Sequence, residues 1–243
     1  MEVRTLLIVL MTLIVMGVLG VVVYETYTLL SPSSGGSATS SVESTTQITT
    51  SLTPATTPQT VTTDLPRSLN QEDGIEFSFA TWFVVNEFGS TGKNYLFAKG
   101  ELLPHAGSDG TLTATASPAV YLTGNTLYVV QDTYSGQTSI AVTSIPSNLM
   151  IHLVVAVTQS TISVYINGVI KELQITDIPK QNTGPVTIAP GAGFNGLIGP
   201  MTYYNYALAN TDIVSLSLQP PNMPQTKSPA PPPYFDAQWY TNN

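Results

Sequence analysis

Short apolar runs of five to eight residues dominate the middle of the chain, where they recur between clusters of Gly, Pro, Asn and Asp from about residue 65 to residue 218. This pattern is typical of a sandwich or barrel of short antiparallel strands. We therefore predict an all-β sandwich domain over residues 66–218. The predicted strands are 75–85, 94–101, 111–117, 119–124, 126–133, 138–145, 151–159, 161–168, 169–175, 184–190 and 196–208.

One turn of this domain has a specific signal. Asn167 and Gly168 separate two apolar runs, and both residue types accept the positive φ of a type I′ hairpin turn. Ser160 separates the first of these runs from the one before it. Residues 151–175 are therefore expected to form a meander of three strands.

The N-terminal part of the chain holds an apolar run of another kind. After the short segment 1–4, residues 5–24 form a stretch of twenty residues without a charge. A helix of that length crosses a hydrocarbon core of about 30 Å, whereas a cleaved signal has a shorter apolar region that ends in small residues. We predict a single-pass transmembrane helix. Arg4 before it and Glu25 after it favour an N-terminus on the cytoplasmic or interior side.

Residues 25–65 have the composition of a flexible stalk. Between residues 31 and 63, 19 of 33 residues are Ser or Thr, three are Pro, and few side chains are apolar. Such a segment buries too little surface to offset the ordering entropy of folding. The composition fits an O-glycosylated stalk and a bare spacer equally well.

A second appendage follows the domain. Residues 219–243 contain seven prolines, which favour extended chain, and end in an aromatic cluster. Large aromatic side chains are the usual anchors of interfaces, so this cluster is expected either to fold back on the domain or to dock on a partner protein. The candidate docking residues are Tyr234, Phe235, Trp239 and Tyr240.

The charge and cysteine content exclude several classes of function. Only 9% of residues are charged and the net charge is −8, so the chain lacks the clustered Lys and Arg with which proteins bind nucleic acid. With no Cys, the chain cannot form disulfides, thiolate metal sites or a cysteine nucleophile. The two His residues leave little for a histidine metal centre.

Five segments, taken in order, resemble a known family. The sequences FSFATWFVV, YLFAKGE, PAVYLTGNTLYVV, VTQSTISVYINGVIKELQI and GFNGLIGPMTYYNYAL are similar to the laminin-G-like jelly roll of the concanavalin-A-like lectin/glucanase superfamily, over about residues 70–217. The resemblance implies a closing strand followed by a short helix at about 210–215. It is closest in wording to variants from large DNA viruses, which implies a viral source.

The same resemblance raises the question of catalysis. The glucanase branch of the superfamily uses a carboxylate nucleophile and a carboxylic acid about 5 to 5.5 Å apart. Its E-x-D-x-x-E pattern is absent from this chain. We therefore predict a protein that is not an enzyme and has no catalytic residues, with a glycoside hydrolase as the least favoured alternative.

Binding chemistry has three candidate residues. Related domains often hold calcium through loop acids, and the acids placed in loops here are Asp109 and Asp132. Tyr134, two residues after Asp132, is the candidate platform for a sugar. The chain has no D-x-D-x-D run, and ordinary turn chemistry also explains both acids. No cofactor is expected, and a metal site stays undecided.

Two hypotheses for the function follow. The first is a non-enzymatic, membrane-anchored structural or attachment protein, which on the viral resemblance would be a minor virion protein that links a membrane to capsid or envelope proteins through its sandwich and tail. The alternative is a membrane-tethered lectin that binds glycans through the loops at one end of the sandwich.

Overall fold

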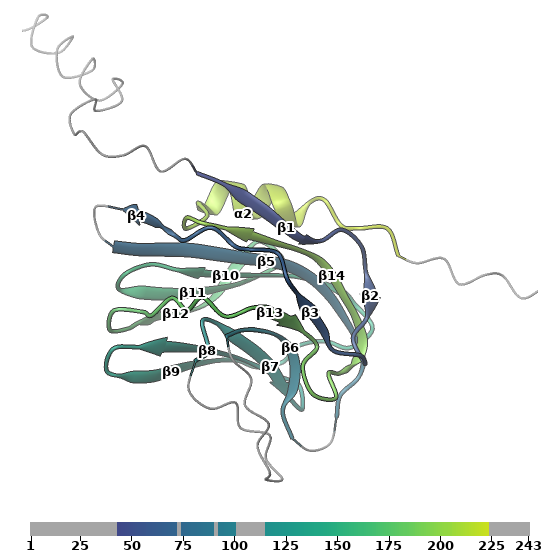
Figure 1. Cartoon of the computed structure of the whole chain (residues 1–243). Coiled ribbons are helices and arrows are strands. Elements are labelled where there is room, and N and C mark those ends of the chain that lie inside the picture. Colours follow the sequence, from purple (N-terminus) through teal and green to yellow (C-terminus); the bar gives the residue numbers. More distant parts are fainter. Residues whose placement is uncertain (1–42, 72–73, 90–91, 101–114, 224–243) are drawn as a thin grey trace, which may run out of the picture. The chain divides into compact units, whose positions relative to one another are not determined.

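The structure is a computed structural model that describes residues 43–71, 74–89, 92–100 and 115–223, and it consists of two antiparallel sheets stacked face to face (Figure 1). The strands of the larger sheet, in spatial order, are β1 (Thr45–Thr49), β14 (Asn195–Tyr204), β5 (Gly74–Glu87), β10 (Met150–Val157), β11 (Thr161–Ile166) and β12 (Val169–Ile175). Two short strands extend it: β2 (Thr53–Pro54) pairs with β14, and β4 (Leu69–Gln71) pairs with β5.

Within the described part of the chain, the smaller sheet has six strands. In spatial order they are β3 (Gln59–Val61), β13 (Val186–Ile188), β6 (Asn94–Lys99), β7 (Ala119–Thr123), β8 (Thr126–Thr133) and β9 (Gly136–Val142). Ten of the fourteen strands among the described residues, all except β1 to β4, overlap strands predicted from the sequence. The predicted all-β sandwich is therefore confirmed.

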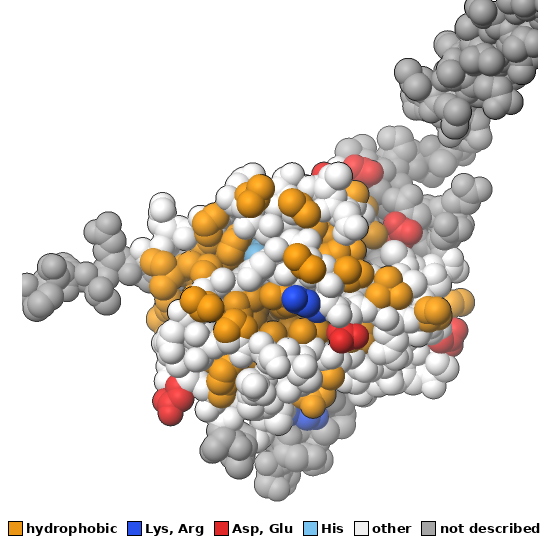
Figure 2. Space-filling view, turned by 180° about the vertical axis from the view of Figure 1, so that it is seen from behind, with side chains coloured by type: hydrophobic (Ala, Val, Ile, Leu, Met, Phe, Trp, Pro, Cys, Tyr) orange, Lys and Arg blue, Asp and Glu red, His pale blue; other side chains and the backbone are white. Residues whose placement is uncertain are grey.

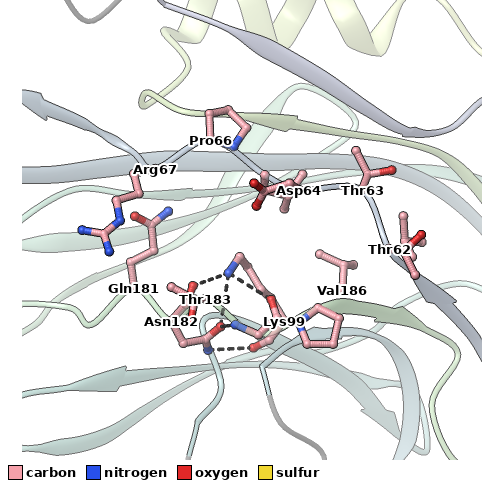
Figure 3. Close-up of a pocket in the computed structure, with 14 residues that line it drawn as sticks. Thr62, Thr63, Asp64, Pro66, Arg67, Lys99, Gln181, Asn182, Thr183 and Val186 are labelled. Atoms are coloured by element: carbon pink, nitrogen blue, oxygen red, sulfur yellow. Dashed lines mark hydrogen bonds between the residues drawn. The ribbon is translucent and has the colours of Figure 1, made fainter.

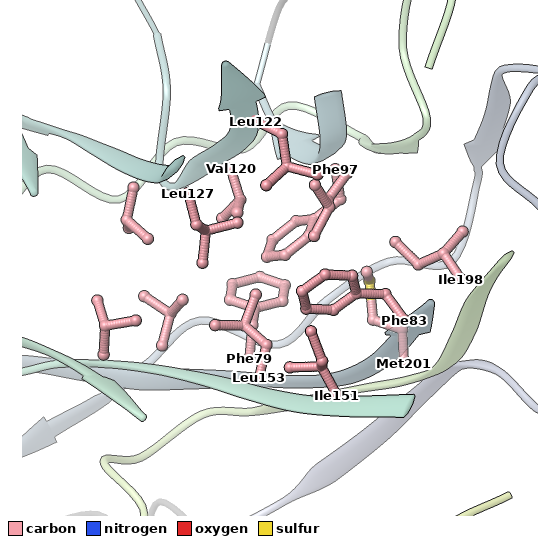
Figure 4. Packing of buried hydrophobic residues seen from close by; sticks show 14 of the residues in the cluster. Phe79, Phe83, Phe97, Val120, Leu122, Leu127, Ile151, Leu153, Ile198 and Met201 are labelled. Carbon is pink, nitrogen blue, oxygen red and sulfur yellow. The ribbon is translucent and has the colours of Figure 1, made fainter. Parts of the chain in front are cut away.

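The core lies between the two sheets, where their inward side chains meet (Figure 4). Alternate residues of each strand point inward, so β8 contributes Leu127 and Val129 to the core and turns Tyr128 outward. Phe79 of β5 lies at the centre, with its ring centroid 5.5 Å from that of Phe97 and 5.0 Å from that of Tyr203. This packing fixes which face of each strand is presented to solvent.

One helix covers part of the outer face of the larger sheet. It is α2 (Asn210–Ser217), whose buried Ile213 packs with Tyr165 and other residues of β5, β10 and β14. The short helix implied by the family resemblance is therefore confirmed at its expected position, directly after the closing strand.

The predicted meander is also confirmed, since β10, β11 and β12 pair as consecutive antiparallel strands. Asn167 and Gly168 join β11 to β12 with φ values of 53° and 79°, as a type I′ turn requires. The Asn167 side-chain oxygen accepts a hydrogen bond of 2.8 Å from the backbone N–H of His152.

The expected stalk at 25–65 is wrong for its second half. Residues 45–61 supply β1, β2 and β3, and β1 pairs with β14 while β3 pairs with β13. Ala55, between β2 and β3, is fully buried. The segment is rich in Thr, whose branched side chain suits a strand once a neighbouring edge is available. The sandwich therefore begins by Thr45 rather than at residue 66.

Several other predictions fall outside the described residues. These are the membrane helix at 5–24, the stalk residues before 43, most of the predicted strand at 111–117, and the tail beyond 223. Residues 115–117, which are described, form no strand. Among the described residues, no helix has both the length and the hydrophobicity to cross a bilayer.

Candidate functional site

A row of three tyrosines crosses the outer face of the smaller sheet. Tyr95 of β6 is the cross-strand partner of Tyr121 of β7, which in turn is the partner of Tyr128 of β8. The ring centroids of the first pair are 5.3 Å apart and those of the second pair 5.2 Å. Leu122 and Leu127, the neighbours of Tyr121 and Tyr128 along the chain, point into the core, so these tyrosines point away from it.

The pair Tyr121–Tyr128 is stacked, with an angle of 14° between the ring planes. On the Tyr121 ring lies the ammonium group of Lys93, 5.1 Å from the centroid. Burial raises the pKa of the Tyr121 phenol, and the nearby Tyr128 adds to the shift, so this hydroxyl stays protonated at neutral pH. On its other side Tyr128 has Ala141 of β9 as its cross-strand partner, whose side chain is a single methyl group, and the Tyr128 side chain is half-buried.

Polar side chains lie beside this ring on the same face of the sheet. The next pair of residues along β8 and β9 that points to this face is Val130 with Ser139, and the pair after that is Asp132 with Gln137. Ser139, Gln137 and Ala141 are all exposed. The face therefore presents a half-buried aromatic ring next to a hydroxyl and an amide.

The predicted binding acid Asp132 is the β8 member of the last of these pairs. It is buried, and desolvation raises the pKa of its carboxyl, while a hydrogen bond with Gln137 and the charge of Lys180 act in the opposite direction. A carboxylate that already has an amide donor and a cation beside it has less to offer a metal ion. Among the described residues, no group of three or more His, Asp or Glu could hold a metal.

Tyr134, the predicted sugar platform, is exposed by 69% and follows Asp132 at the tip of the β8–β9 hairpin. The ammonium group of Lys180 lies 5.2 Å from its ring centroid. The structure thus brings Asp132, Tyr134 and Lys180 together at one end of the sandwich. The remaining candidates, Asp109 and the tail aromatics Tyr234, Phe235, Trp239 and Tyr240, lie outside the described residues.

A polar pocket of about 630 Å³ opens elsewhere at the same end of the sandwich (Figure 3). Its walls are residues 61–67, which lead from β3 towards β4, and residues 181–186, which lead into β13. Asp64 and Arg67 line its exposed side, and Lys99 reaches it from the end of β6.

Lys99 is held entirely by the second wall of this pocket. Its ammonium group donates to the backbone oxygen of Asn182, to the side-chain oxygen of Asn182 at 3.2 Å and to the backbone oxygen of Gly184 at 3.3 Å. Burial lowers the pKa of Lys99 to about 8, although Asp64 acts to raise it. Three acceptors use all three donors of an ammonium group, so Lys99 fixes the loop.

The wall formed by residues 61–67 is also held by hydrogen bonds, which reach it from Gln181 and Tyr203. The Gln181 side-chain amide donates to the Tyr203 hydroxyl at 2.9 Å, and that hydroxyl donates to the backbone oxygen of Pro66 at 3.0 Å. The backbone N–H of Ser68 donates to the Gln181 side-chain oxygen at 3.1 Å. These bonds hold the two walls together across the pocket, and they engage Gln181 as the loop oxygens engage Lys99.

Comparison with protein families matches residues 55–214 to the concanavalin A-like lectin/glucanases superfamily in its laminin G form. The chain belongs to that superfamily. The match begins inside the segment that supplies β1 to β3, in agreement with the early start of the sandwich. No curated protein matches the chain in sequence.

Solved structures with a similar fold include the binding domain of botulinum neurotoxin serotype D, with 11% identity and a TM-score of 0.49, over 72% of this chain and 42% of that one. A structure of botulinum neurotoxin type C, a toxin whose cell entry depends on interaction with two ganglioside molecules, has 16% identity and a TM-score of 0.46, over 59% of this chain and 35% of that one. The binding domain of neurotoxin DC in complex with rat synaptotagmin II has 12% identity and a TM-score of 0.46, over 59% and 35%. This chain spans less than half the length of each.

The tyrosine row was missed by sequence reasoning, although a signal for part of it exists. Tyr121 and Tyr128 are equally distant from the turn at Gly124 and Asn125, so a hairpin there makes them cross-strand partners. The outward direction follows from the apolar Leu122 and Leu127 beside them. Tyr95 is distant in sequence, and its place in the row depends on the pairing of β6 with β7.

Proposed function

We propose that this chain is a non-enzymatic glycan-binding protein that takes a sugar ring on the outer face of its smaller sheet. The observation that carries the proposal is the half-buried Tyr128 ring, which is stacked on Tyr121 on one side and has the small Ala141 as its cross-strand partner on the other. A lectin was the alternative hypothesis from the sequence, with its site at the loops rather than on this face.

A sugar ring has an apolar face of C–H groups and a rim of hydroxyls. Its binding therefore calls for an aromatic ring beside a few polar side chains, a combination that tyrosine-rich binding surfaces also use. Tyr128 supplies the ring, and the exposed Ser139 and Gln137 supply hydrogen-bonding groups on the next strand. Because the Lys93 ammonium lies on the Tyr121 ring, it adds a positive charge to this face, which suits an acidic sugar.

The pocket between residues 61–67 and 181–186 is a weaker candidate for the binding site than the tyrosine face. Its main cation, Lys99, has its three donors engaged by loop oxygens, and Gln181 spans the two walls. Hydrolysis by a retaining glycosidase needs two carboxyl groups about 5 to 5.5 Å apart. Asp64 is the single acid that lines this pocket among the described residues.

The test is a glycan array probed with the full-length protein in mild detergent. We expect at least one glycan to be retained, and Tyr128→Ala to weaken its binding by about tenfold or more, as the loss of an aromatic anchor does. Tyr134→Ala is the matched control, because it removes a more exposed tyrosine at the hairpin tip. An array without binding, or equal losses in both variants at unchanged thermal stability, would overturn the proposal.

We also propose a setting for this binding face. The apolar run at residues 5–24 would anchor the protein in a membrane with its N-terminus on the cytoplasmic or interior side, so that the sandwich lies on the far side. The length and low charge of the run support this proposal. The link to capsid or envelope proteins of a large DNA virus through the C-terminal tail stays a prediction from the sequence.

A further inference from the structure

The strand β12 forms one edge of the larger sheet and is exposed along its whole length. It follows β11 as the last strand in the spatial order, so one side of its backbone has no strand partner among the described residues. Its four apolar residues are exposed by 56%, 42%, 55% and 79% at Val169, Ile170, Leu173 and Ile175. Long apolar edges of this kind are usually covered in native proteins, because they pair readily with another strand.

Two elements lie near β12, and neither pairs with its edge as a strand. The strand β9 of the smaller sheet comes close to part of β12, and just beyond the end of β12 the hydroxyls of Thr138 and Thr176 lie 3.1 Å apart. The helix α2 covers Tyr165 on the neighbouring strand β11. Figure 2, which views the molecule from behind, shows hydrophobic side chains gathered around a basic side chain that lies beside an acidic one.

We propose that β12 pairs with the β12 strand of a second copy of this chain, antiparallel and about a two-fold axis between Lys171 and Glu172. In this register Lys171 of each copy lies opposite Glu172 of the other, and Ile170 lies opposite Leu173. Each favourable pair occurs twice, because a two-fold interface uses the same surface of both copies. The strand VIKELQI is thus complementary to itself in both charge and hydrophobicity.

The faces of the strand agree with this register. Ile170 pairs with Tyr165 of β11 and Leu173 pairs with Ser163, so a bulge between them places both side chains on the outer face of the sheet. Opposed residues of an antiparallel pair point to the same side, so Ile170 and Leu173 of the two copies would meet there. A slip by one residue would place Glu172 opposite Glu172, which like-charge repulsion disfavours.

The first test exchanges the charges of Lys171 and Glu172. The oligomeric state of each full-length variant is measured in mild detergent over a dilution series. Lys171→Glu and Glu172→Lys should each weaken association by about tenfold or more, since each places like charges opposite one another. The double variant K171E/E172K should restore it. Arg67→Glu, which changes the net charge by the same amount as Lys171→Glu on an exposed residue away from β12, is the control and should have no effect.

The second test uses the absence of cysteine from the chain, which removes any background from disulfide cross-linking. A mixture of Ile170→Cys and Leu173→Cys chains should form a cross-linked dimer on mild oxidation, because directly opposed strand residues meet the distance that a disulfide requires. Val214→Cys on α2, with a similar exposure of 45%, is the control for random collision.

A double variant that fails to restore association would overturn the proposal, as would a mixture that cross-links no better than the control. A wild-type chain that is monomeric throughout the dilution series would also overturn it, and would leave the edge to another protein or to residues 224–243.

Discussion

His152 is buried in β10, and its charge state links a single residue to the stability of the sheet. Its ring lies 4.7 Å from that of Trp82, centroid to centroid, and Nδ1 has no hydrogen-bond partner among the described residues. Desolvation lowers the pKa of this imidazole from 6.5 to about 4. The folded protein therefore holds His152 neutral at pH values where the unfolded chain would bind a proton.

This difference predicts a specific loss of stability in acid. As the pH falls from 6.5 towards 4, the unfolded state gains a proton at His152 that the folded state does not, so the free energy of unfolding falls by roughly 3 kcal/mol from this residue. His152→Phe should remove that part of the pH dependence, because a phenyl ring fills similar space without titrating. Urea unfolding at pH 4, 5, 6 and 7 measures it.

The carboxylates of the protein also titrate in this range, so the informative quantity is the difference between the two proteins at each pH. A variant whose stability falls in parallel with that of the wild type over the whole window would contradict the role of His152.

Single elements differ in how far the sequence determines them. The strands of the core were predictable because their inward residues are strongly apolar, and the β11–β12 turn because Asn-Gly has few alternatives. β1 and β3 were missed because TTQIT and QTV carry little apolar surface, and their strands form against edges supplied by β14 and β13, far along the chain. Pairing between distant segments also decided the position of Tyr95 in the candidate site.

The contribution of these early strands can be tested by truncation. A chain that starts at residue 43 should unfold as cooperatively as the full-length protein, whereas one that starts at residue 66 loses β1, β2 and β3 and exposes the edges of β14 and β13. Because Ala55 is fully buried, the shorter chain also loses part of the core, and we expect a destabilisation of at least about 3 kcal/mol. Thermal unfolding followed by circular dichroism measures the difference.

Equal midpoints for the two truncated chains would show that the sandwich is complete without its first three strands.

At the scale of the whole molecule, the sequence predicts a binding domain tethered to a membrane. The proposed glycan-binding face and the β12 edge lie on different sheets, so the proposed dimer would leave both Tyr128 rings accessible. Two sugar sites on one assembly raise its overall avidity for a surface that carries many copies of a glycan.

The tether has its own test. The full-length protein should remain in the membrane pellet after extraction with alkaline carbonate, because the twenty uncharged residues at 5–24 are proposed to span the hydrocarbon core. The chain without residues 1–24 should appear in the supernatant. Release of both proteins would refute the anchor.

The pairing of β1 with β14 determines how the sandwich bears mechanical load. Any force that arrives from residues before Thr45 enters the domain through β1, so the bonds at its start are stretched first. The first of these bonds runs from the backbone N–H of Ser44 to the side-chain oxygen of Asn205, at 2.7 Å. The second runs from the backbone N–H of Asn205 to the backbone oxygen of Ser44, at 3.2 Å. If the proposed tether and glycan site both hold, a pull on a bound glycan would be resisted at the junction of the first and last strands of the sandwich.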